Sequence, residues 1–344
     1  MTVQRKDGEE YYLNYTLDAE RTEPGVDGTN TLFNGQNTLT VGGRKRFNSA
    51  VSVFGEERRS FGNTAGLTHA YGIDFNLAER WTLGASFEIG EVETLTQIVD
   101  REAVTVSAGY GHENVNVGAA FEWREDTIDG INRKTWFLRS NASAKITPSL
   151  QALLRFDRAE SNSDAGAFFD GEFTEFQVAG AYRPVENDRF NALLRYTYYE
   201  DLAGAEQVSN SGQTGLPAQR SNIFSLDAQY RLNNWLTLGG KYGYRNGEVS
   251  LTRVSDDFVD STAQLGILRA DIHFIKKWDA VLEGRILDVS AADDRRAGFL
   301  GAIYRHVGEN AKIGVGYNFT DFSDDLTDLT FDDSGVFLNL IAKF

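Results

Sequence analysis

Three patterns in the sequence predict an all-β fold, a closed antiparallel transmembrane β-barrel of about 18 strands, with about 16 as the alternative count. Apolar and polar residues alternate in many segments, the connections between segments are short and long in turn, and aromatic residues gather at segment ends. The strands of a soluble sandwich also alternate apolar and polar residues. A membrane barrel fits better, because the predicted strands are numerous and about ten residues long, and their connections are short and long in turn. A propeller would show a repeat of about 40 residues with a shared motif, which the sequence lacks.

Period-two alternation is clear in the segment that begins at Trp81. Trp81, Leu83 and Phe87 lie in one phase of this segment, and Thr82 and Glu88 lie in the other. Successive side chains of a strand point to opposite faces, so each such segment has one apolar face and one polar face. The same test predicts strands near residues 10–20, 38–47, 50–59, 67–77, 81–91, 103–110, 115–125, 135–146, 150–159, 173–183, 189–200, 221–232, 235–246, 263–275, 278–289, 296–306, 311–320 and 335–344.

The predicted connections alternate in length. Short ones include Asn48-Ser49 and Lys276-Lys277, whereas long ones include residues 21–37, 201–220 and 321–334. Bacterial membrane barrels have short periplasmic turns and long extracellular loops. This alternation therefore predicts a single barrel domain over residues 1–344 with both termini on the periplasmic side.

Aromatic residues mark the strand ends beside the short turns. Rings with a polar edge settle at the headgroup level of a membrane and form a girdle there. The residues that we predict for this girdle are Phe75, Trp81, Tyr110, Tyr182, Tyr230, Trp235, Phe274, Trp278 and Tyr304.

Composition excludes several classes of protein. A net charge of -16 disfavours a nucleic-acid partner, because phosphate binding needs a basic surface, and the absence of cysteine excludes disulfides and thiolate metal sites. No apolar run approaches the roughly 18 residues of a membrane helix, and a mean hydropathy of -0.38 also argues against a helical membrane protein. The first residues have no apolar secretory core, so we expect that the sequence begins within a longer chain.

The last ten residues carry a resemblance. Val336, Leu338, Leu340, Ala342 and Phe344 lie in one phase and end on an aromatic residue. This pattern resembles the terminal strand of bacterial outer-membrane β-barrel proteins, whose final aromatic residue is read by the barrel-assembly machinery. The resemblance implies that Phe344 is the assembly signal and the native terminus, and that outer-membrane lipid, lipopolysaccharide and that machinery are the partners.

The stretch from Gly314 to Asp328, Gly-Val-Gly-Tyr-Asn-Phe-Thr-Asp-Phe-Ser-Asp-Asp-Leu-Thr-Asp, carries a narrower resemblance. It is similar to the C-terminal barrel of large repeat-containing bacterial surface proteins. This likeness covers about the last 30 residues. It implies that further domains of the same polypeptide precede the barrel.

If the apolar phase faces lipid, the polar phase lines the lumen. A charged, arginine-rich wall can attract anions, whereas neighbouring residues of opposite sign can also pair and simply satisfy the lumen. Positive and negative residues occur on neighbouring strands, which favours ion pairs. The pairs and an anion-attracting wall are compatible if the pairs line the wall without filling the bore. The predicted lumen-lining residues are Arg44, Arg46, Arg58, Arg124, Arg139, Arg155, Arg195, Arg231, Arg245, Arg269, Arg285, Arg305, Glu88, Glu122, Asp157, Asp227, Asp271 and Glu283.

Catalysis and metal binding have little support in the sequence. Asp324, Asp325 and Asp328 are weak Ca²⁺ candidates in the last loop, because carboxylates bind this ion, but the EF-hand spacing is not met and a solvated acidic loop is favoured. Of the four histidines, His273 lies two residues from Asp271 in one phase, which fits a satisfied lumen histidine better than a catalytic one. We therefore predict no enzyme, no cofactor and no metal site.

Two functions remain open at this stage. A barrel of 16–18 strands can leave an aqueous channel, which predicts porin-like passage or export of small polar or anionic solutes. The alternative is a barrel that anchors a larger surface or periplasmic protein in the membrane and has no open pore.

Overall fold

The structure is a computed structural model. It describes residues 2–4, 8–16, 21–24, 30–33, 37–61, 66–93, 98–164, 171–187, 189–201, 218–250, 258–290, 293–308, 311–320, 322, 326 and 334–342. Within these ranges, no helix has the length and apolar character that would let it cross a membrane.

The described residues form an antiparallel sheet of 20 strands and a separate hairpin of two strands. The hairpin, β3 (Arg21–Pro24) with β4 (Asn30–Phe33), lies in a segment that was predicted as a loop. The strands of the sheet are β1 (Thr2–Gln4), β2 (Glu9–Thr16), β5 (Asn37–Arg46), β6 (Val51–Phe61), β7 (Leu67–Ala78), β8 (Trp81–Glu93), β9 (Ile98–His112), β10 (Val115–Ile128), β11 (Ile131–Thr147), β12 (Leu150–Ser163), β13 (Gly171–Tyr182), β14 (Phe190–Asp201), β15 (Ala218–Arg231), β16 (Leu236–Ser250), β17 (Val259–Asp260), β18 (Ala263–Ile275), β19 (Trp278–Val289), β20 (Asp294–Val307), β21 (Ala311–Asn318) and β22 (Gly335–Ala342).

The strand count differs slightly from the predicted one. In the described part of the chain, β1 and β17 have three and two residues, and the other 18 strands of the sheet have at least eight. The two short strands therefore account for the difference. They pair only briefly, β1 with β2 and β17 with β16.

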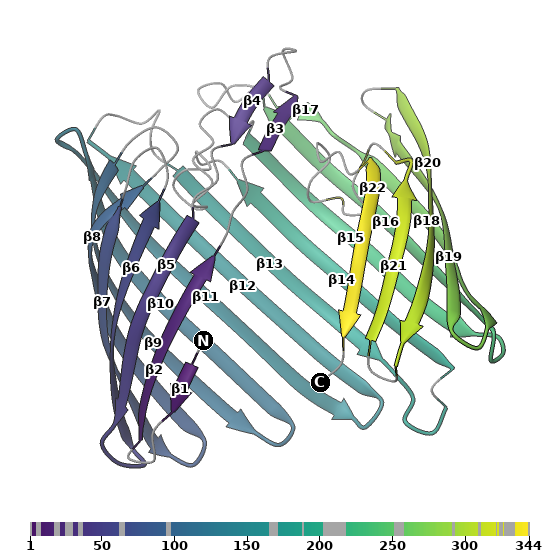
Figure 1. Ribbon diagram of the computed structural model, residues 1–344. Coiled ribbons are helices and arrows are strands. Elements are labelled where there is room, and N and C mark those ends of the chain that lie inside the picture. Colours follow the sequence, from purple (N-terminus) through teal and green to yellow (C-terminus); the bar gives the residue numbers. More distant parts are fainter. Residues whose placement is uncertain are drawn as a thin grey trace. The chain divides into compact units, whose positions relative to one another are not determined.

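The chain divides into two compact units. The N-terminal unit comprises residues 1–142, 156–174 and 201–217, and the C-terminal unit comprises residues 143–155, 175–200 and 218–344. In the N-terminal unit, β2 pairs with β5, and each of β5 to β9 pairs with the next strand along the chain (Figure 1). In the C-terminal unit, β15 pairs with β16, β16 with β18, and each of β18 to β21 with the next strand. Every one of these pairs is antiparallel.

The register gives each unit an apolar face and a polar face. Tyr71 of β7 pairs with Phe87 of β8, and both side chains are exposed, whereas Asp74 pairs with Gly84 on the other face. Directly paired residues share a face, so the alternation in the sequence is preserved from strand to strand. Large apolar side chains are exposed along the strands of both units. Exposed apolar surface on this scale marks contact with a membrane or a partner.

Asparagine side chains fold the short turns. The Oδ1 atom of Asn48 accepts hydrogen bonds from the backbone N–H groups of Ala50 and Val51, both at 2.8 Å. The Oδ1 atom of Asn233 accepts equivalent bonds from Trp235 and Leu236, at 3.0 and 2.9 Å. An Asn side chain that mimics a backbone turn in this way fixes a tight connection locally. These turns were predicted from the sequence.

The connection between β10 and β11 is much shorter than predicted. Asp129 and Gly130 have φ values of 50° and 81°, and the strands continue to Ile128 on one side and from Ile131 on the other. Positive φ at both central residues defines a two-residue hairpin turn for which Asp-Gly is a preferred sequence. The predicted strand ends at 125 and 135 were therefore wrong, because this turn signal was overlooked.

Candidate functional site: the charged sheet face and the loop that covers it

Buried ion pairs occupy the polar face of the N-terminal unit. Asp126 lies between two guanidinium groups, with Oδ1 at 2.7 Å from Nε of Arg101 and Oδ2 at 3.3 Å from Nε of Arg124. All three side chains are largely buried. Arg101 and Asp126 pair directly across β9 and β10, so the register brings them together. Arg101 and Asp126 were not among the predicted lumen residues, because both were placed in connections. Asp126 continues the period-two phase of Arg124 in β10, which was the signal that could have found it.

This cluster predicts a large stability effect. Replacing Asp126 by Asn removes the carboxylate that both buried guanidinium groups contact and leaves Arg124 its longer contact with Glu122 at 3.8 Å, which we expect to cost about 3 kcal/mol of unfolding free energy. Replacing Asp294, which pairs with Arg296 in an exposed position at 2.7 Å, should cost about 0–1 kcal/mol. Urea unfolding in detergent, followed by tryptophan fluorescence, measures both. Equal losses for D126N and D294N would contradict the buried network.

Ion pairs also cross the polar face of the C-terminal unit. Nε of Arg285 donates to Oε1 of Glu283 at 2.5 Å, and Arg269 binds Asp271 with Nη2–Oδ1 at 2.9 Å. Nη1 of Arg269 is also 4.0 Å from Oε2 of Glu283, so one chain of charges runs across β18 and β19. These guanidinium and carboxylate groups pair with each other along the polar face, as expected for charges that line a wall.

The register and the contacts place the predicted lumen residues other than Arg305 on the polar face of their own unit. In the N-terminal unit, for example, Arg44 contacts Asp74 at 3.3 Å, and in the C-terminal unit Arg155 contacts Glu175 at 3.6 Å. For all the predicted lumen residues, it remains a prediction that this face lines a pore. The residues on the polar face are Arg44, Arg46, Arg58, Glu88, Glu122, Arg124, Arg139 and Asp157 of the N-terminal unit and Arg155, Arg195, Asp227, Arg231, Arg245, Arg269, Asp271, Glu283 and Arg285 of the C-terminal unit.

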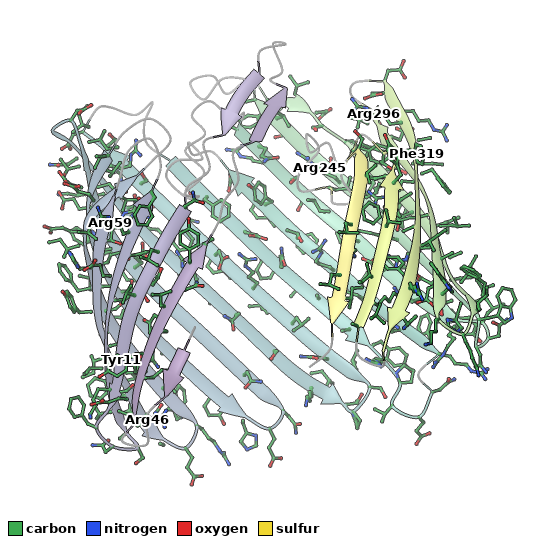
Figure 2. The ribbon with its side chains drawn as sticks, viewed as in Figure 1. Tyr11, Arg46, Arg59, Arg245, Arg296 and Phe319 are labelled. Atoms are coloured by element: carbon green, nitrogen blue, oxygen red, sulfur yellow. The ribbon has the colours of Figure 1, made fainter. Side chains whose placement is uncertain are left out.

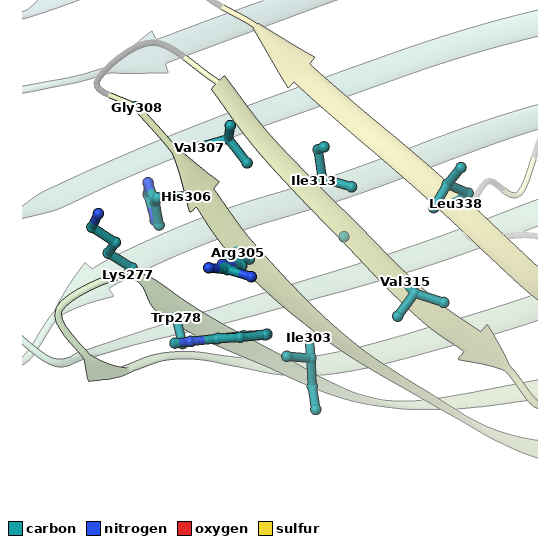
Figure 3. Close-up of a pocket in the computed structure, with 11 residues that line it drawn as sticks. Lys277, Trp278, Ile303, Arg305, His306, Val307, Gly308, Ile313, Val315 and Leu338 are labelled. Atoms are coloured by element: carbon teal, nitrogen blue, oxygen red, sulfur yellow. The ribbon is translucent and has the colours of Figure 1, made fainter.

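Two neighbouring residues of β20 were assigned to the wrong faces. Arg305 pairs with Trp278 and Ile313 on the apolar face and stacks over the Trp278 ring at 5.6 Å, whereas Tyr304 is buried on the polar face. Arg305 and Trp278 line a groove of about 770 Å³ on the apolar side, together with Ile303 and Leu338. Figure 3 shows these side chains. The arginine stem lies along this apolar surface, as long cationic side chains commonly do. Arg305 is therefore no lumen residue and Tyr304 no girdle residue.

Two described residues of the last long loop, Phe322 and Leu326, lie against the polar face of the C-terminal unit. Phe322 and Leu326 are both buried, with 0% and 4% exposure, and pack with Ile223, Leu265 and other apolar residues into one cluster. Leu265 shares the polar face with Gly243 of β16, its direct partner. A Cβ atom on Gly243 would lie 2.8 Å from Cδ1 of Leu326, so the glycine is needed for this close approach. The described loop residues thus cover part of the face that the charges occupy elsewhere.

Arg245 ties this loop to the sheet. Its side chain is 2% exposed, and its Nη1 donates to the backbone carbonyl of Leu326 at 3.2 Å, while its Nη2 donates to Oε1 of Gln219 at 3.1 Å (Figure 2). Within the described residues no carboxylate forms a salt bridge with Arg245, so two neutral acceptors hold a buried cation. The sequence placed Arg245 in the polar phase but gave no signal that it would anchor a loop.

The structure describes the predicted girdle residues but not the weak metal candidates. Trp81, Tyr110 and Trp278 lie at strand ends beside short turns, and the Trp81 and Tyr110 rings contact each other with centroids 4.8 Å apart. Their position in a membrane interface stays a prediction, as it does for Phe75, Tyr182, Tyr230, Trp235 and Phe274. The weak calcium candidates Asp324, Asp325 and Asp328 and the assembly signal Phe344 lie outside the described residues.

His273 and Asp271 lie on one face of β18, as their spacing predicted, but each side chain binds another residue. Asp271 binds Arg269, whereas Nδ1 of His273 is 2.6 Å from Oδ1 of Asp279 in the next strand. His273 and Asp279 pair directly across β18 and β19, so the register decides this contact. Spacing within one strand could not reveal it.

Comparison with known proteins bears on the fold. No protein-family model matches the chain, and no curated protein matches its sequence. Among solved structures, the siderophore receptor PirA from Acinetobacter baumannii is similar with a TM-score of 0.54 and 8% identity over 94% of this chain and 64% of PirA. The copper transporter OprC is similar with a TM-score of 0.52 and 9% identity over 90% of this chain and 62% of OprC.

A third structure is the alcaligin outer-membrane receptor FauA from Bordetella pertussis, with a TM-score of 0.50 and 11% identity over 97% of this chain and 70% of FauA. The chain has the fold of bacterial outer-membrane β-barrel proteins. At these identities the likeness shows this fold alone. The chain spans less than two thirds of OprC and PirA, so the activities of those proteins do not transfer with the fold.

Proposed function

We propose that this chain is an outer-membrane channel that passes or exports small polar or anionic solutes through a charged lumen. The proposal rests mainly on the two faces of the sheet, one exposed and apolar, the other lined with arginines and carboxylates. A membrane barrel needs this alternation, because its outer face meets hydrocarbon and its inner face meets water. As single-domain barrels do, the chain would close over residues 1–344 with both termini in the periplasm.

Closure of the sheet follows from the physics of lipid. β22 pairs with β21, and its Val336 and Leu338 are 74% and 78% exposed. An open strand edge with unpaired backbone groups is too costly within a bilayer, so β22 should hydrogen-bond to the strands at the start of the chain.

Engineered cysteines test this closure. The chain has no cysteine of its own, so a Y15C/L338C or Y15C/V336C pair reports a single contact. We expect at least one pair to form an intrachain disulfide in the folded, membrane-inserted protein, because β1 pairs with β2 only at residues 10–12 and Tyr15 lies beyond it, where β22 would be the neighbour. A Y71C/L338C pair serves as the control that should remain reduced. Failure of every β2–β22 pair to cross-link, with the protein correctly folded, would reject a closed barrel.

A second function has one observation in its favour. Phe322 and Leu326 cover part of the polar face, which would narrow the bore of a closed barrel. A barrel narrowed enough would conduct poorly and would serve instead as the membrane anchor of a larger surface or periplasmic protein. In either case we propose outer-membrane lipid, lipopolysaccharide and the barrel-assembly machinery as partners, and neither enzymatic activity nor a nucleic-acid partner.

Conductance in planar bilayers separates the two functions. The purified full chain, reconstituted in a planar lipid bilayer, should produce steady openings of uniform size if it is a channel. The E172Q variant, whose partner Arg158 lies on the apolar face, should give the same openings and serves as a control. Correctly folded protein that inserts but never conducts would reject the channel and favour the anchor.

A further inference from the structure

We propose that His273, Asp279 and His306 form a binding site for a divalent transition-metal ion such as Zn²⁺. The three residues come from consecutive strands, β18, β19 and β20, at the end where the short turn Lys276–Lys277 connects β18 to β19. This site is independent of whether the chain conducts, and it departs from the sequence-based prediction that no metal is bound.

The three side chains converge on one point. Nδ1 of His273 is 2.6 Å from Oδ1 of Asp279, and Nε2 of His306 is 2.9 Å from Oδ2 of the same carboxylate. One ligand atom from each residue lies within 4.8 Å of the other two. Zinc binds His nitrogen and carboxylate oxygen at about 2.0–2.2 Å, so ligand atoms this close can reach one ion with small side-chain rotations.

The backbone holds these positions firmly. His273 and Asp279 are direct partners across β18 and β19, and Asp279 pairs with Tyr304, two residues before His306 on the same face of β20. The backbone N–H of His273 donates to the carbonyl of Trp235 at 2.7 Å, and that of His306 donates to the carbonyl of Lys277 at 2.9 Å. Ligands on paired strands are better positioned than ligands on loops, which lowers the cost of ordering them around an ion.

The donor set suits a borderline metal with open coordination positions. Two imidazoles and one carboxylate on one side of an ion leave the remaining positions to water, as in known two-histidine, one-carboxylate sites. The side chains of His273, Asp279 and His306 are 45%, 17% and 39% exposed, so an ion can enter from solvent. His306 and the neighbouring Lys277 are visible near the turn in Figure 3.

Lys312 is the natural competitor for this carboxylate. Its Nζ donates to Oδ2 of Asp279 at 2.7 Å, so without metal the carboxylate is bound by a lysine and two imidazoles. The same Nζ lies 4.8 Å from the centre of the Tyr304 ring, which offers the ammonium group a second favourable position. Metal binding should therefore move the Lys312 ammonium group away from Asp279. The lysine should not prevent the metal from binding.

Titration of the full chain in detergent with ZnCl₂, by calorimetry, tests the site. We expect about one Zn²⁺ per chain, with affinity falling at least about 10-fold in H306A and in D279N, because each loses a ligand. K312M should bind more tightly, since it removes the competing cation. H112A, which changes a histidine in the N-terminal unit, should bind as the wild type does. Co²⁺ should give visible absorption bands of nitrogen and oxygen coordination that H306A loses.

Two results would overturn the proposal. One is no Zn²⁺ binding by a chain whose circular dichroism shows folded β structure, which would leave the cluster as an ion-pair network only. The other is Zn²⁺ binding that H306A, D279N and H112A reduce equally, which would indicate scattered surface histidines. If D279N fails to fold, H273N and H306N keep the carboxylate and its lysine partner and still remove one ligand each.

Discussion

Replacing Phe322 and Leu326 together by alanine is expected to increase the single-channel conductance of the reconstituted chain. Both side chains are buried against the polar face, and they hold the described part of the last loop there. A buried Phe→Ala change alone costs about 3–5 kcal/mol, which corresponds to a shift of about 100-fold or more toward the undocked loop. An undocked loop would no longer narrow the bore that we propose.

The matched control for this experiment is Phe319. It lies three residues from Phe322 but is 63% exposed and contacts Tyr317, with ring centroids 4.3 Å apart. F319A removes the same side chain from the same segment without touching the cluster on the polar face, so its conductance should equal that of the wild type. If F322A/L326A and F319A conduct alike, the docked loop does not control the bore.

Arg245 provides an independent test of the same loop. R245M removes both hydrogen bonds that the guanidinium group donates, to Leu326 and Gln219, and keeps an unbranched apolar chain in the buried space. Because neutral acceptors hold this cation, its loss frees no buried carboxylate in the described part of the site, and the sheet should remain folded. We expect larger openings, of the same kind as in F322A/L326A.

Replacing Arg155 and Arg195 together by glutamate is expected to weaken or reverse a preference for anions. Both side chains lie on the polar face of the C-terminal unit, where Arg155 contacts Glu175 and Nε of Arg195 donates to Oγ of Ser225. The double change makes the wall more negative by about four charges at neutral pH and leaves Glu175 beside a second carboxylate. Selectivity in a hydrated pore follows such fixed charges.

The reversal potential in a salt gradient measures this preference, and Arg158 supplies the control. Arg158 lies three residues beyond Arg155 on β12, so it points to the other face, and its Nη2 donates to Oε1 of Glu172 at 2.7 Å. R158Q should leave the reversal potential unchanged. An unchanged potential in R155E/R195E would show that the arginines only satisfy neighbouring carboxylates and do not select ions.

The sequence alone predicted the strands and their two faces. Alternation such as Trp81, Leu83 and Phe87 against Thr82 and Glu88 is a local property, because consecutive side chains of a strand must point to opposite faces. The Asn48 and Asn233 turns could also be predicted, since each asparagine binds its own neighbouring backbone. Strand ends were less certain, as Asp129-Gly130 illustrates, because one overlooked two-residue turn moved both ends.

Only the tertiary structure decided which side chains meet across strands. The register between β18 and β19 placed His273 opposite Asp279, and the register between β9 and β10 placed Asp126 opposite Arg101. Register depends on the pairing of distant segments, and a shift of one residue would exchange the faces. The docking of Phe322 onto the polar face likewise needed a cluster assembled from several strands, which no pattern within the loop itself can reveal.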